Sequence, residues 1–304
     1  MTLIIGAKVK NILNYYESEN PGVKSNIVRL LTHGRLGNTG KLVILPVDQG
    51  FEHGPIKSFE SNPEAYDPCY HFQLAIESQV SAFAAPIGII ESSASTYAGM
   101  LPLILKLNSS YSLLHSNTIS YDQAITASVR DALRLGCTAV GFTIYPGADK
   151  CYDMIEEARA IIAEAKSYGL PTILWSYPRG INLSKSGETA IDIIAYAVHI
   201  AALLGAHIIK VKLPTQHLEN EQIEAHSIEL LSQRIEFVKK SCFVGKRILL
   251  FSGGCSKHID DILYEVTEIS RGGGHGSMIG RNVFQRKRED ALSMLREIMK
   301  IYAT

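Results

Sequence analysis

The chain has 304 residues, of which 46% are hydrophobic and 20% are charged, the composition of a globular protein with a large buried core. Its 30 basic and 30 acidic residues balance, which excludes the strong net charge that favours nucleic acid or an anionic membrane surface as a partner. Residues 1–7 lack the basic start of a signal peptide, and the longest apolar region, 191–209, contains Asp192, His199 and His207, which indicates a buried helix and strand and not a membrane span.

The cysteines are five in number, and no two of them have CxxC spacing. An odd number without paired spacing argues against a disulfide framework and against a structural zinc site. We therefore expect a reducing compartment and a cytoplasmic location. The cysteines are Cys69, Cys137, Cys151, Cys242 and Cys255.

The first forty residues predict a short helical N-terminal extension. Val9, Ile12 and Tyr16 recur at helical spacing, and the glycines Gly34 and Gly40 mark a loop after a second helical pattern. We expect residues 1–40 to cover one end or side of a single domain formed by residues 41–304.

Beyond residue 40, apolar runs typical of strands alternate with helical patterns. The predicted strands are residues 42–47, 80–84, 101–107, 138–145, 171–175, 206–213, 247–251 and 277–280. The predicted helices are residues 64–78, 89–99, 121–135, 149–168, 187–204, 219–240, 256–271 and 283–301.

This alternation predicts an α/β fold with a parallel sheet, because parallel strands need a crossover connection. Eight strand–helix units match the (β/α)8 TIM barrel. The competing doubly wound sheet lacks support, since no GxGxxG follows the first strand. In a barrel the active site lies at the carboxyl ends of the strands, so unusual residues just after each run are the site candidates.

The first predicted strand is followed by Asp48, Glu52 and His53 in a glycine-containing loop. A lone carboxylate at the end of a buried run is unfavourable unless it is paired or functional. Asp48 is therefore a site candidate, with a helix-capping aspartate as the alternative. Glu52 and His53 add two titratable groups, or merely form a polar loop.

Three further strands contribute single candidates. Lys106 interrupts an apolar strand, and a structural ion pair with Asp48 explains it as well as direct chemistry does. Tyr145 ends the fourth strand, where a phenol can act as an acid or base or can simply pack. Arg179 follows the fifth strand and is either an anion ligand or a surface arginine.

The sixth predicted strand carries Lys210 and Lys212 at alternate positions, so both side chains point to the same face. Burial and mutual repulsion lower a lysine pKa, and a neutral lysine is the species that attacks a carbonyl to form a Schiff base. The alternative is an edge strand with two solvated lysines. Alternation alone does not choose between the two residues.

The loops after the seventh and eighth strands are rich in glycine. Barrels often bind phosphate between these two loops, with backbone N–H groups at helix N-termini. Glycine lets the phosphate approach the backbone, and a hydroxyl and a guanidinium add donors. We predict a phosphate site formed by Ser252, Gly253, Gly254, Gly280 and Arg281.

With these residues assembled, the chain resembles the class I fructose-bisphosphate aldolases of the archaeal and bacterial DhnA type. The resemblance covers about residues 20–300 and rests on the segments LPVDQGFEHGP at 45–55, YPG at 145–147, IKVK at 209–212, SGG at 252–254 and GRN at 280–282. It implies that Lys210 forms the Schiff base and that Asp48 and Tyr145 assist proton transfer and hold substrate hydroxyls. Gln49 stands where the archaeal branch usually has His, which looks like the bacterial branch.

The implied reaction is the reversible cleavage of fructose 1,6-bisphosphate to dihydroxyacetone phosphate and glyceraldehyde 3-phosphate in glycolysis or gluconeogenesis. The iminium serves as the electron sink, so no metal or other cofactor is expected, and no pair of residues at ligand spacing suggests one. Arg179 or the loop with His53 is the candidate for a second phosphate anchor. Lys212 is expected to provide a positive charge that helps keep Lys210 neutral.

Two rival functions stay open on the sequence. One is a related Schiff-base aldolase or transaldolase that acts on another sugar phosphate, and the other is a non-catalytic barrel that binds phosphosugars. The partner expected in every case is a small sugar phosphate, with neither nucleic acid nor membrane. The resemblance also implies a homo-oligomer, and a decamer built of five-fold rings is one such assembly.

Overall fold

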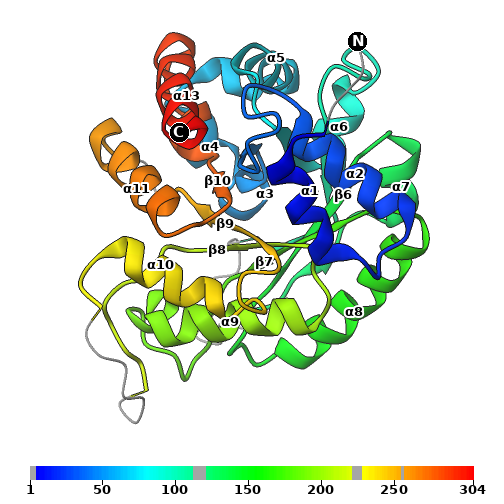
Figure 1. Ribbon diagram of the computed structural model, residues 1–304. Helices are drawn as coiled ribbons and strands as arrows, with labels where there is room; N and C mark the ends of the chain where they lie inside the picture. The colour runs from blue at the N-terminus through cyan, green and yellow to red at the C-terminus, as the bar shows by residue number, and fades with distance from the viewer. Residues whose placement is uncertain (1–4, 112–120, 221–227, 255–256) are drawn as a thin grey trace.

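The computed structural model describes residues 5–111, 121–220, 228–254 and 257–304 (Figure 1). Eight parallel strands close into a barrel in the order β1-β10-β9-β8-β7-β6-β3-β2. The strands are β1 Leu42–Pro46, β2 Ala82–Pro86, β3 Leu103–Lys106, β6 Ala139–Ile144, β7 Thr172–Ser176, β8 Ile208–Val211, β9 Ile248–Ser252 and β10 Gly276–Met278. Each predicted strand overlaps one of these, so the (β/α)8 prediction is confirmed.

The helices follow the strands in turn around the outside of the barrel, as the colour sequence in Figure 1 shows. The longer ones are α5 Pro68–Ser78, α8 Cys151–Ser167, α9 Ile191–Leu203, α10 Leu231–Lys240, α11 Ile259–Arg271 and α13 Arg288–Ala303. The shorter ones are α3 Gln49–His53, α4 Pro55–Phe59, α6 Ile87–Ser93, α7 Val129–Arg134 and α12 Arg281–Phe284. No helix among the described residues is long and apolar enough to cross a membrane.

The largest differences from the prediction are at the starts of two helices, α7 and α10. α7 begins only after Ser128, whose hydroxyl accepts from the Asp131 N–H while the Asp131 carboxylate accepts from the Ser128 N–H. This capping box fixes the helix start, and the residues before it pair as a small antiparallel hairpin of β4 Asn108–Ser109 with β5 Ala124–Ile125, which was not predicted. α10 begins at Leu231, and part of its predicted range, 221–227, lies outside the described residues.

The buried side chains form two apolar clusters that lie on opposite faces of the barrel wall. One cluster packs between the strands and the outer helices. The other contains alternate strand residues, such as Leu42 and Ile44 of β1 or Ile208 of β8, together with residues of the first two helices. Because side chains alternate along a strand, this second cluster is the barrel interior.

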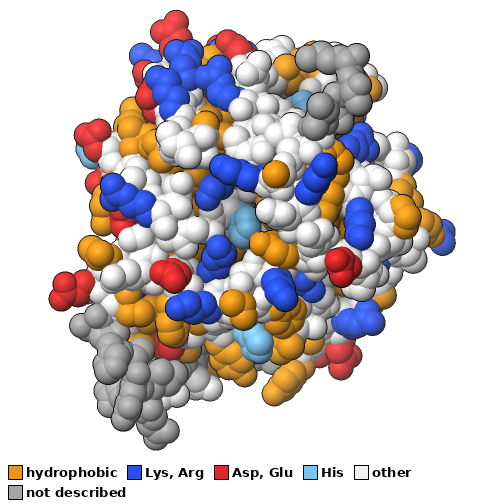
Figure 2. Space-filling view, in the orientation of Figure 1, with side chains coloured by type: hydrophobic (Ala, Val, Ile, Leu, Met, Phe, Trp, Pro, Cys, Tyr) orange, Lys and Arg blue, Asp and Glu red, His pale blue; other side chains and the backbone are white. Residues whose placement is uncertain are grey.

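The N-terminal helices α1 Ala7–Leu13 and α2 Pro21–Thr32 contribute Val9, Ile12 and Ile27 to the interior cluster. They lie in front of the strands in Figure 1, and basic, acidic and hydrophobic side chains are interspersed over the face seen in Figure 2. These two helices thus cover one end of the barrel. The boundary between residues 40 and 41 stays a prediction; β1 begins at Leu42.

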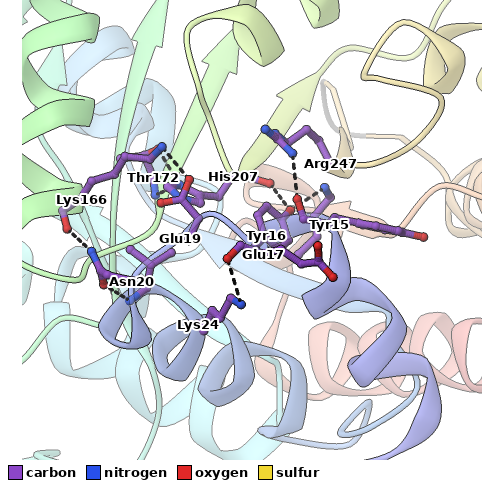
Figure 3. Close-up of polar contacts among 12 residues, drawn as sticks. Tyr15, Tyr16, Glu17, Glu19, Asn20, Lys24, Lys166, Thr172, His207 and Arg247 are labelled. Atoms are coloured by element: carbon purple, nitrogen blue, oxygen red, sulfur yellow. Dashed lines mark hydrogen bonds and ion pairs between the residues drawn. The ribbon is translucent and has the colours of Figure 1, made fainter.

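Polar contacts join this extension to the amino ends of β8 and β9 (Figure 3). The Tyr16 hydroxyl donates to the His207 carbonyl at 2.6 Å and accepts from the Ile248 N–H at 3.1 Å. His207 Nδ1 accepts from the Thr172 N–H, so the ring proton is on Nε2, which lies 3.5 Å from Glu19 Oε1. This contact lowers the pKa of Glu19 to about 2. The covered end is therefore the one opposite the carboxyl ends of the strands.

Candidate active site

The side chains of the site lie on the same strand faces as the side chains that fill the barrel interior. Ile208 of β8 is part of the interior cluster, and Lys210 and Lys212 follow on the same face. Ile104 and Lys106 of β3 stand in the same relation. The strand positions that are apolar in the lower layers thus become polar at the carboxyl ends, where they line a cavity of about 600 Å³.

All eleven predicted site residues line this one cavity. They are Asp48, His53, Tyr145, Arg179, Lys210, Lys212, Ser252, Gly253, Gly254, Gly280 and Arg281. The lining holds eight Lys or Arg side chains against three Asp or Glu, an excess of five positive charges if the histidine is neutral. A cavity with that excess attracts a polyanionic substrate.

Lys210 lies at the floor of the cavity and is 4% exposed. β8 pairs with β7 and β9, so it is not an edge strand and the solvated alternative is wrong. Lys210 Nζ lies 5.1 Å from the centre of the Trp175 ring and 5.6 Å from that of Tyr177. These rings keep water from one side of the amine.

Burial is the main reason that the pKa of Lys210 falls from 10.5 to about 8. The negative charge of Asp48 opposes the shift, and the positive charge of Lys106 adds to it. A shift of this size raises the neutral fraction at pH 7 roughly 300-fold, to about a tenth of the molecules. Lys210 is thus prepared to act as a nucleophile at neutral pH.

Lys212 does not have the expected effect on Lys210. β8 ends at Val211, and Lys212 Nζ donates to Glu188 Oε2 at 2.6 Å, so its charge is balanced by a carboxylate. The cations that lower the pKa of Lys210 are Lys106 and Arg281. The sequence could not reveal this, because Glu188 reaches Lys212 from the segment before α9.

Asp48 directly follows β1 and precedes α3, but its side chain makes no capping hydrogen bond with that helix. The capping alternative is therefore wrong. The Asp48 carboxylate instead acts on Lys210, Lys106 and Tyr177 through its charge. The predicted ion pair between Lys106 and Asp48 is replaced by hydrogen bonds from Lys106 Nζ to Asn108.

Two tyrosines border the cavity in different surroundings. Tyr145 is held by hydrogen bonds with Ser110 and Gln123 and lies under the Arg179 guanidinium, 4.7 Å from the ring centre. Tyr177 was overlooked by the sequence prediction and contacts Lys210 directly. Burial and the Asp48 charge raise the pKa of Tyr177 well above 10, whereas a hydrogen bond with Ser252 opposes the shift.

Arg179 faces the loop after β1. Its Nη2 donates to Glu52 Oε1 at 3.2 Å, and His53 Nε2 lies 3.9 Å from Glu52 Oε2. Burial opposes the ionisation of Glu52, but the charges of Arg179 and His53 lower its pKa overall. Burial lowers the pKa of His53, and the negative charge of Glu52 opposes that shift.

The loops after β9 and β10 lie against each other. Asn282 Nδ2 donates to the Gly253 carbonyl at 3.0 Å, and Arg281 Nη2 donates to the Gly254 carbonyl at 3.2 Å. A Cβ at Gly280 would lie 2.5 Å from the Pro46 carbonyl oxygen, so only glycine fits there. These contacts bring the two glycine-containing loops and the Arg281 guanidinium together in the lining of the cavity.

A metal site does not emerge from the described residues, in which no group of three or more His, Cys, Asp or Glu side chains is placed to hold an ion. The residues that sequence reasoning missed are Trp175 and Tyr177. Strand alternation could have predicted both residues. Ile173, Trp175 and Tyr177 occupy alternate positions and therefore share the interior face of β7 and its continuation.

Comparison with known proteins places these features in a family. Residues 42–286 match the DeoC/LacD family aldolase. The chain is 34% identical to a probable fructose-bisphosphate aldolase class 1 of Chlamydia muridarum, over 99% of this chain and 90% of the relative. It is 36% identical to the fructose-bisphosphate aldolase class 1 of Thermoproteus tenax, over 86% of this chain and 89% of the relative.

Solved structures agree with the sequence relatives. One solved structure is an archaeal fructose-1,6-bisphosphate aldolase whose catalytic lysine is covalently bound to the carbinolamine intermediate of its substrate. It superposes with a TM-score of 0.76 at 33% identity, over 92% of this chain and 99% of that chain. A Schiff-base-forming fructose-1,6-bisphosphate aldolase gives 0.73 at 35% identity, over 86% and 94%. The chain belongs to the DeoC/LacD family of aldolases and, within it, to the group of class 1 fructose-bisphosphate aldolases.

Proposed function

We propose that this chain is a Schiff-base fructose-1,6-bisphosphate aldolase that reversibly forms dihydroxyacetone phosphate and glyceraldehyde 3-phosphate, as in glycolysis and gluconeogenesis. The observation that carries the proposal is Lys210, a buried lysine with a pKa near 8 on the floor of a strongly cationic cavity. The names of the relatives give the substrate class.

The chemistry begins when the neutral Lys210 amine attacks the C2 ketone of the substrate. A C–N bond forms, water leaves, and the resulting iminium is an electron sink. Removal of the C4 hydroxyl proton then breaks the C3–C4 bond and releases glyceraldehyde 3-phosphate. The enamine that remains is protonated at C3, and hydrolysis frees dihydroxyacetone phosphate and Lys210.

The proton transfers need a group beside the imine carbon. Tyr145 was the sequence candidate, and it stays a prediction. The distances favour Tyr177, whose ring centre is 5.6 Å from Lys210 Nζ and whose hydroxyl interacts with Ser252 at the same end of the barrel. We assign the proton transfer to Tyr177 and Asp48 together: the Asp48 carboxylate accepts the C4 hydroxyl proton, and the Tyr177 hydroxyl donates a proton to C3 of the enamine and is then reprotonated by Asp48.

The two phosphates need separate anchors. We assign one phosphate to Ser252, Gly253, Gly254, Gly280 and Arg281, which line the cavity and can offer backbone N–H groups, a hydroxyl and a guanidinium. The other is assigned to Arg179 and Lys212, which follow β7 and β8. Each of these two cations has a carboxylate partner, Glu52 and Glu188, that a phosphate can replace.

A related aldolase for another sugar phosphate would keep Lys210 and the glycine loops, and a non-catalytic phosphosugar barrel would keep only the loops. Lys210 argues against the non-catalytic barrel. Phosphate binding alone favours a charged lysine, whereas burial lowers the pKa of Lys210 and favours its neutral form. The cations on both sides of the cavity favour a bisphosphate over a monophosphate.

The test is borohydride reduction of the protein mixed with fructose 1,6-bisphosphate, followed by peptide mass spectrometry. We expect a stable adduct on Lys210 and none in Lys210→Met. An adduct on Lys212 would keep the reaction class and overturn the residue assignment. Absence of any adduct, with phosphosugar binding intact, would support the non-catalytic barrel.

Three further predictions concern the surroundings of the reaction. Full activity in EDTA is expected for a reaction that needs no metal, and loss of activity would contradict it. A homo-oligomer, expected from the family resemblance, is tested by light scattering; exposed Tyr196 and Leu203 on α9 are candidate contacts. The cytoplasmic location is tested by fractionation of the source cells.

A further inference from the structure

Three lysines gather at the amino end of the barrel, opposite the cavity that contains Lys210. Lys41 directly precedes β1, Lys8 lies on α1, and Lys239 lies near the end of α10. Lys41 Nζ donates to the carbonyl of Gly274, shortly before β10, at 2.6 Å. None of the three lysines forms an ion pair with a carboxylate of the described residues, so their positive charges are not balanced there.

Two glycines leave room for the Lys239 side chain to reach this place. A Cβ at Gly245 would lie 2.7 Å from Lys239 Cε, and a Cβ at Gly273 would lie 2.9 Å from Lys239 Nζ. Both glycines have a positive φ, 80° and 74°, which other residues rarely adopt. Gly273 is next to Gly274, whose carbonyl accepts from Lys41. The two ammonium groups therefore lie at the same turn before β10.

The lysines repel one another at this turn. Burial is the main cause that lowers the pKa of Lys41 from 10.5 to about 8, and the charges of Lys239 and Lys8 lower it further. Burial also lowers the pKa of His275 to about 3, and the charges of Lys239 and Lys41 add to that shift. Every charged group that acts on these two residues is positive. An anion bound here would relieve the repulsion.

His275, which directly precedes β10, adds a neutral donor to the lysines. Its Nδ1 accepts from the Leu249 N–H at 3.1 Å, so the ring proton lies on Nε2. In the part of the chain that the structure describes, no acceptor receives this Nε2 proton. The side chain is 8% exposed, so the ring lies just below the surface on which the lysines stand.

The start of β8 shows the same arrangement with its anion in place (Figure 3). There His207 Nδ1 accepts from the Thr172 N–H, as His275 does from a neighbouring strand. Glu19 Oε1 lies 2.6 Å from Lys166 Nζ and 3.5 Å from His207 Nε2. A carboxylate of the N-terminal extension thus joins a lysine and a histidine there. The start of β10 has the histidine and the lysines, but within the described ranges it has no such carboxylate.

We propose that Lys8, Lys41, Lys239 and His275 form a second anion site, at the amino end of the barrel, that binds a phosphate group as the free dianion or as a monoester. Several ammonium groups favour a multivalent oxyanion over chloride, and phosphate oxygens can accept from all four donors. The bound anion would join α1 to β1, α10 and β10, as Glu19 joins the extension to β8. This site goes beyond the proposed aldolase reaction and does not depend on it.

The experiment follows each lysine separately, so phosphate bound in the cavity near Lys210 does not interfere. Acetic anhydride acetylates a neutral amine: an N–C bond forms, acetate leaves, and the amine proton passes to the buffer. Inorganic phosphate should raise the pKa of Lys41 by about one unit and slow its acetylation at pH 8 about fivefold, with saturation. Sodium chloride keeps the ionic strength constant. Peptide mass spectrometry measures the rates at Lys41, Lys8 and Lys239.

Variants of one helix position separate a site from general attraction. Lys239→Met should raise the dissociation constant for phosphate, measured from the protection of Lys41, about tenfold. Lys240→Met is the matched control, because Lys240 is the next residue of α10 and lies 3.7 Å from Glu236. It should leave the constant unchanged. Lys239→Glu supplies a carboxylate of the Glu19 kind and should slow the acetylation of Lys41 without phosphate.

The proposal is overturned if phosphate does not protect Lys41, if chloride protects it equally, or if Lys240→Met weakens binding as much as Lys239→Met does. Lys8→Met, at an exposed position of α1, should also weaken binding and provides a second test in case Lys239→Met does not fold. Glycerol 2-phosphate in place of inorganic phosphate distinguishes the two sources of the phosphate group. The source with the lower dissociation constant is the ligand that the site prefers.

Discussion

Glu52 and Arg179 meet across the mouth of the barrel, with Arg179 Nη2 3.2 Å from Glu52 Oε1. Glu52 belongs to the segment after β1 and Arg179 to the segment after β7, and these two strands lie opposite each other in the closed order. The ion pair therefore spans the opening above Lys210. A phosphate bound at Arg179, as proposed above, would compete with the Glu52 carboxylate for this guanidinium.

Replacing Arg179 and replacing Glu52 should change the KM for the substrate in opposite directions. Arg179→Met should raise the KM for fructose 1,6-bisphosphate roughly 10- to 100-fold, the usual effect of losing a charged hydrogen bond. Glu52→Gln should lower the KM by up to about fivefold, because a partly exposed ion pair is weak. Steady-state kinetics at constant ionic strength measure both. Two changes of the same sign would show that the pair serves structure and not binding.

The two tyrosines can be separated by their hydroxyl groups. Tyr177→Phe should lower kcat by roughly 10²- to 10⁴-fold, the range for loss of a general acid or base. Tyr145→Phe should lower kcat less than tenfold, since Tyr145 is bound to Ser110 and Gln123 and covered by Arg179. Borohydride should still trap an adduct on Lys210 in both variants. The reverse order of effects would restore Tyr145 as the proton carrier.

The contrast between these tyrosines illustrates what the sequence could predict. Strand alternation fixes which face each residue occupies, so Asp48, Lys210 and Ser252 were placed correctly at one end of the barrel. A Tyr-Pro pair follows both β6 and β7, however, at 145–146 and 177–178. Only the closed barrel shows that Trp175 and Tyr177 lie next to Lys210, because β7 and β8 are neighbours.

The sequence prediction also misjudged Lys212, because sequence distance does not show which charged groups meet in the folded barrel. Along the sequence, Lys212 is two residues from Lys210 and Lys106 is more than a hundred residues away. In space, Lys212 turns to Glu188, and Lys106 shares the Trp175 ring with Lys210. Local spacing predicts the direction of a side chain but not the partner that neutralises its charge.

The lowered pKa of Lys210 means that burying its positive charge destabilises the folded chain. Replacing Lys210 by an uncharged residue should therefore raise the free energy of unfolding. Below pH 8 Lys210 is protonated in both the folded and the unfolded chain, so the full penalty of burying its charge applies. Between pH 8 and 10.5 only the unfolded chain holds the proton, so stability rises with pH and the penalty fades. Lys210→Met should therefore raise the free energy of unfolding by about 2–3 kcal/mol at pH 7.

Urea unfolding at pH 7 and at pH 10 measures this difference. The gain of Lys210→Met over the wild-type chain should shrink at pH 10, even though the variant is inactive at both values. Lys212→Met is the comparison: burial lowers the pKa of Lys212 as well, but the contact with Glu188 opposes that shift, so its loss should stabilise the fold less than the loss of Lys210 does. A gain that is equal at both pH values would mean that packing, and not charge, produces it.

Gly141 leaves room for the Trp175 ring, which contacts both Lys106 and Lys210. It occupies an interior position of β6, where a Cβ would lie 2.2 Å from Trp175 Cζ3 and 2.5 Å from Cη2. The indole ring can lie across the barrel only because this side chain is absent. Gly141→Ala should displace Trp175 and destabilise the fold by about 1–3 kcal/mol, as overpacking of a core does.

Displacement of the ring should also impair the amine that rests against it, so the rate of adduct formation on Lys210 at pH 7 should fall in Gly141→Ala. The control is Gly88→Ala in α6, where a Cβ meets nothing within 4 Å and φ is not positive. That change should leave both stability and adduct formation unchanged or slightly raise stability, since alanine favours a helix. If Gly141→Ala lost stability but kept the adduct rate, the Trp175 ring would be a packing element only, and burial by the rest of the barrel would have to account for the low pKa of Lys210.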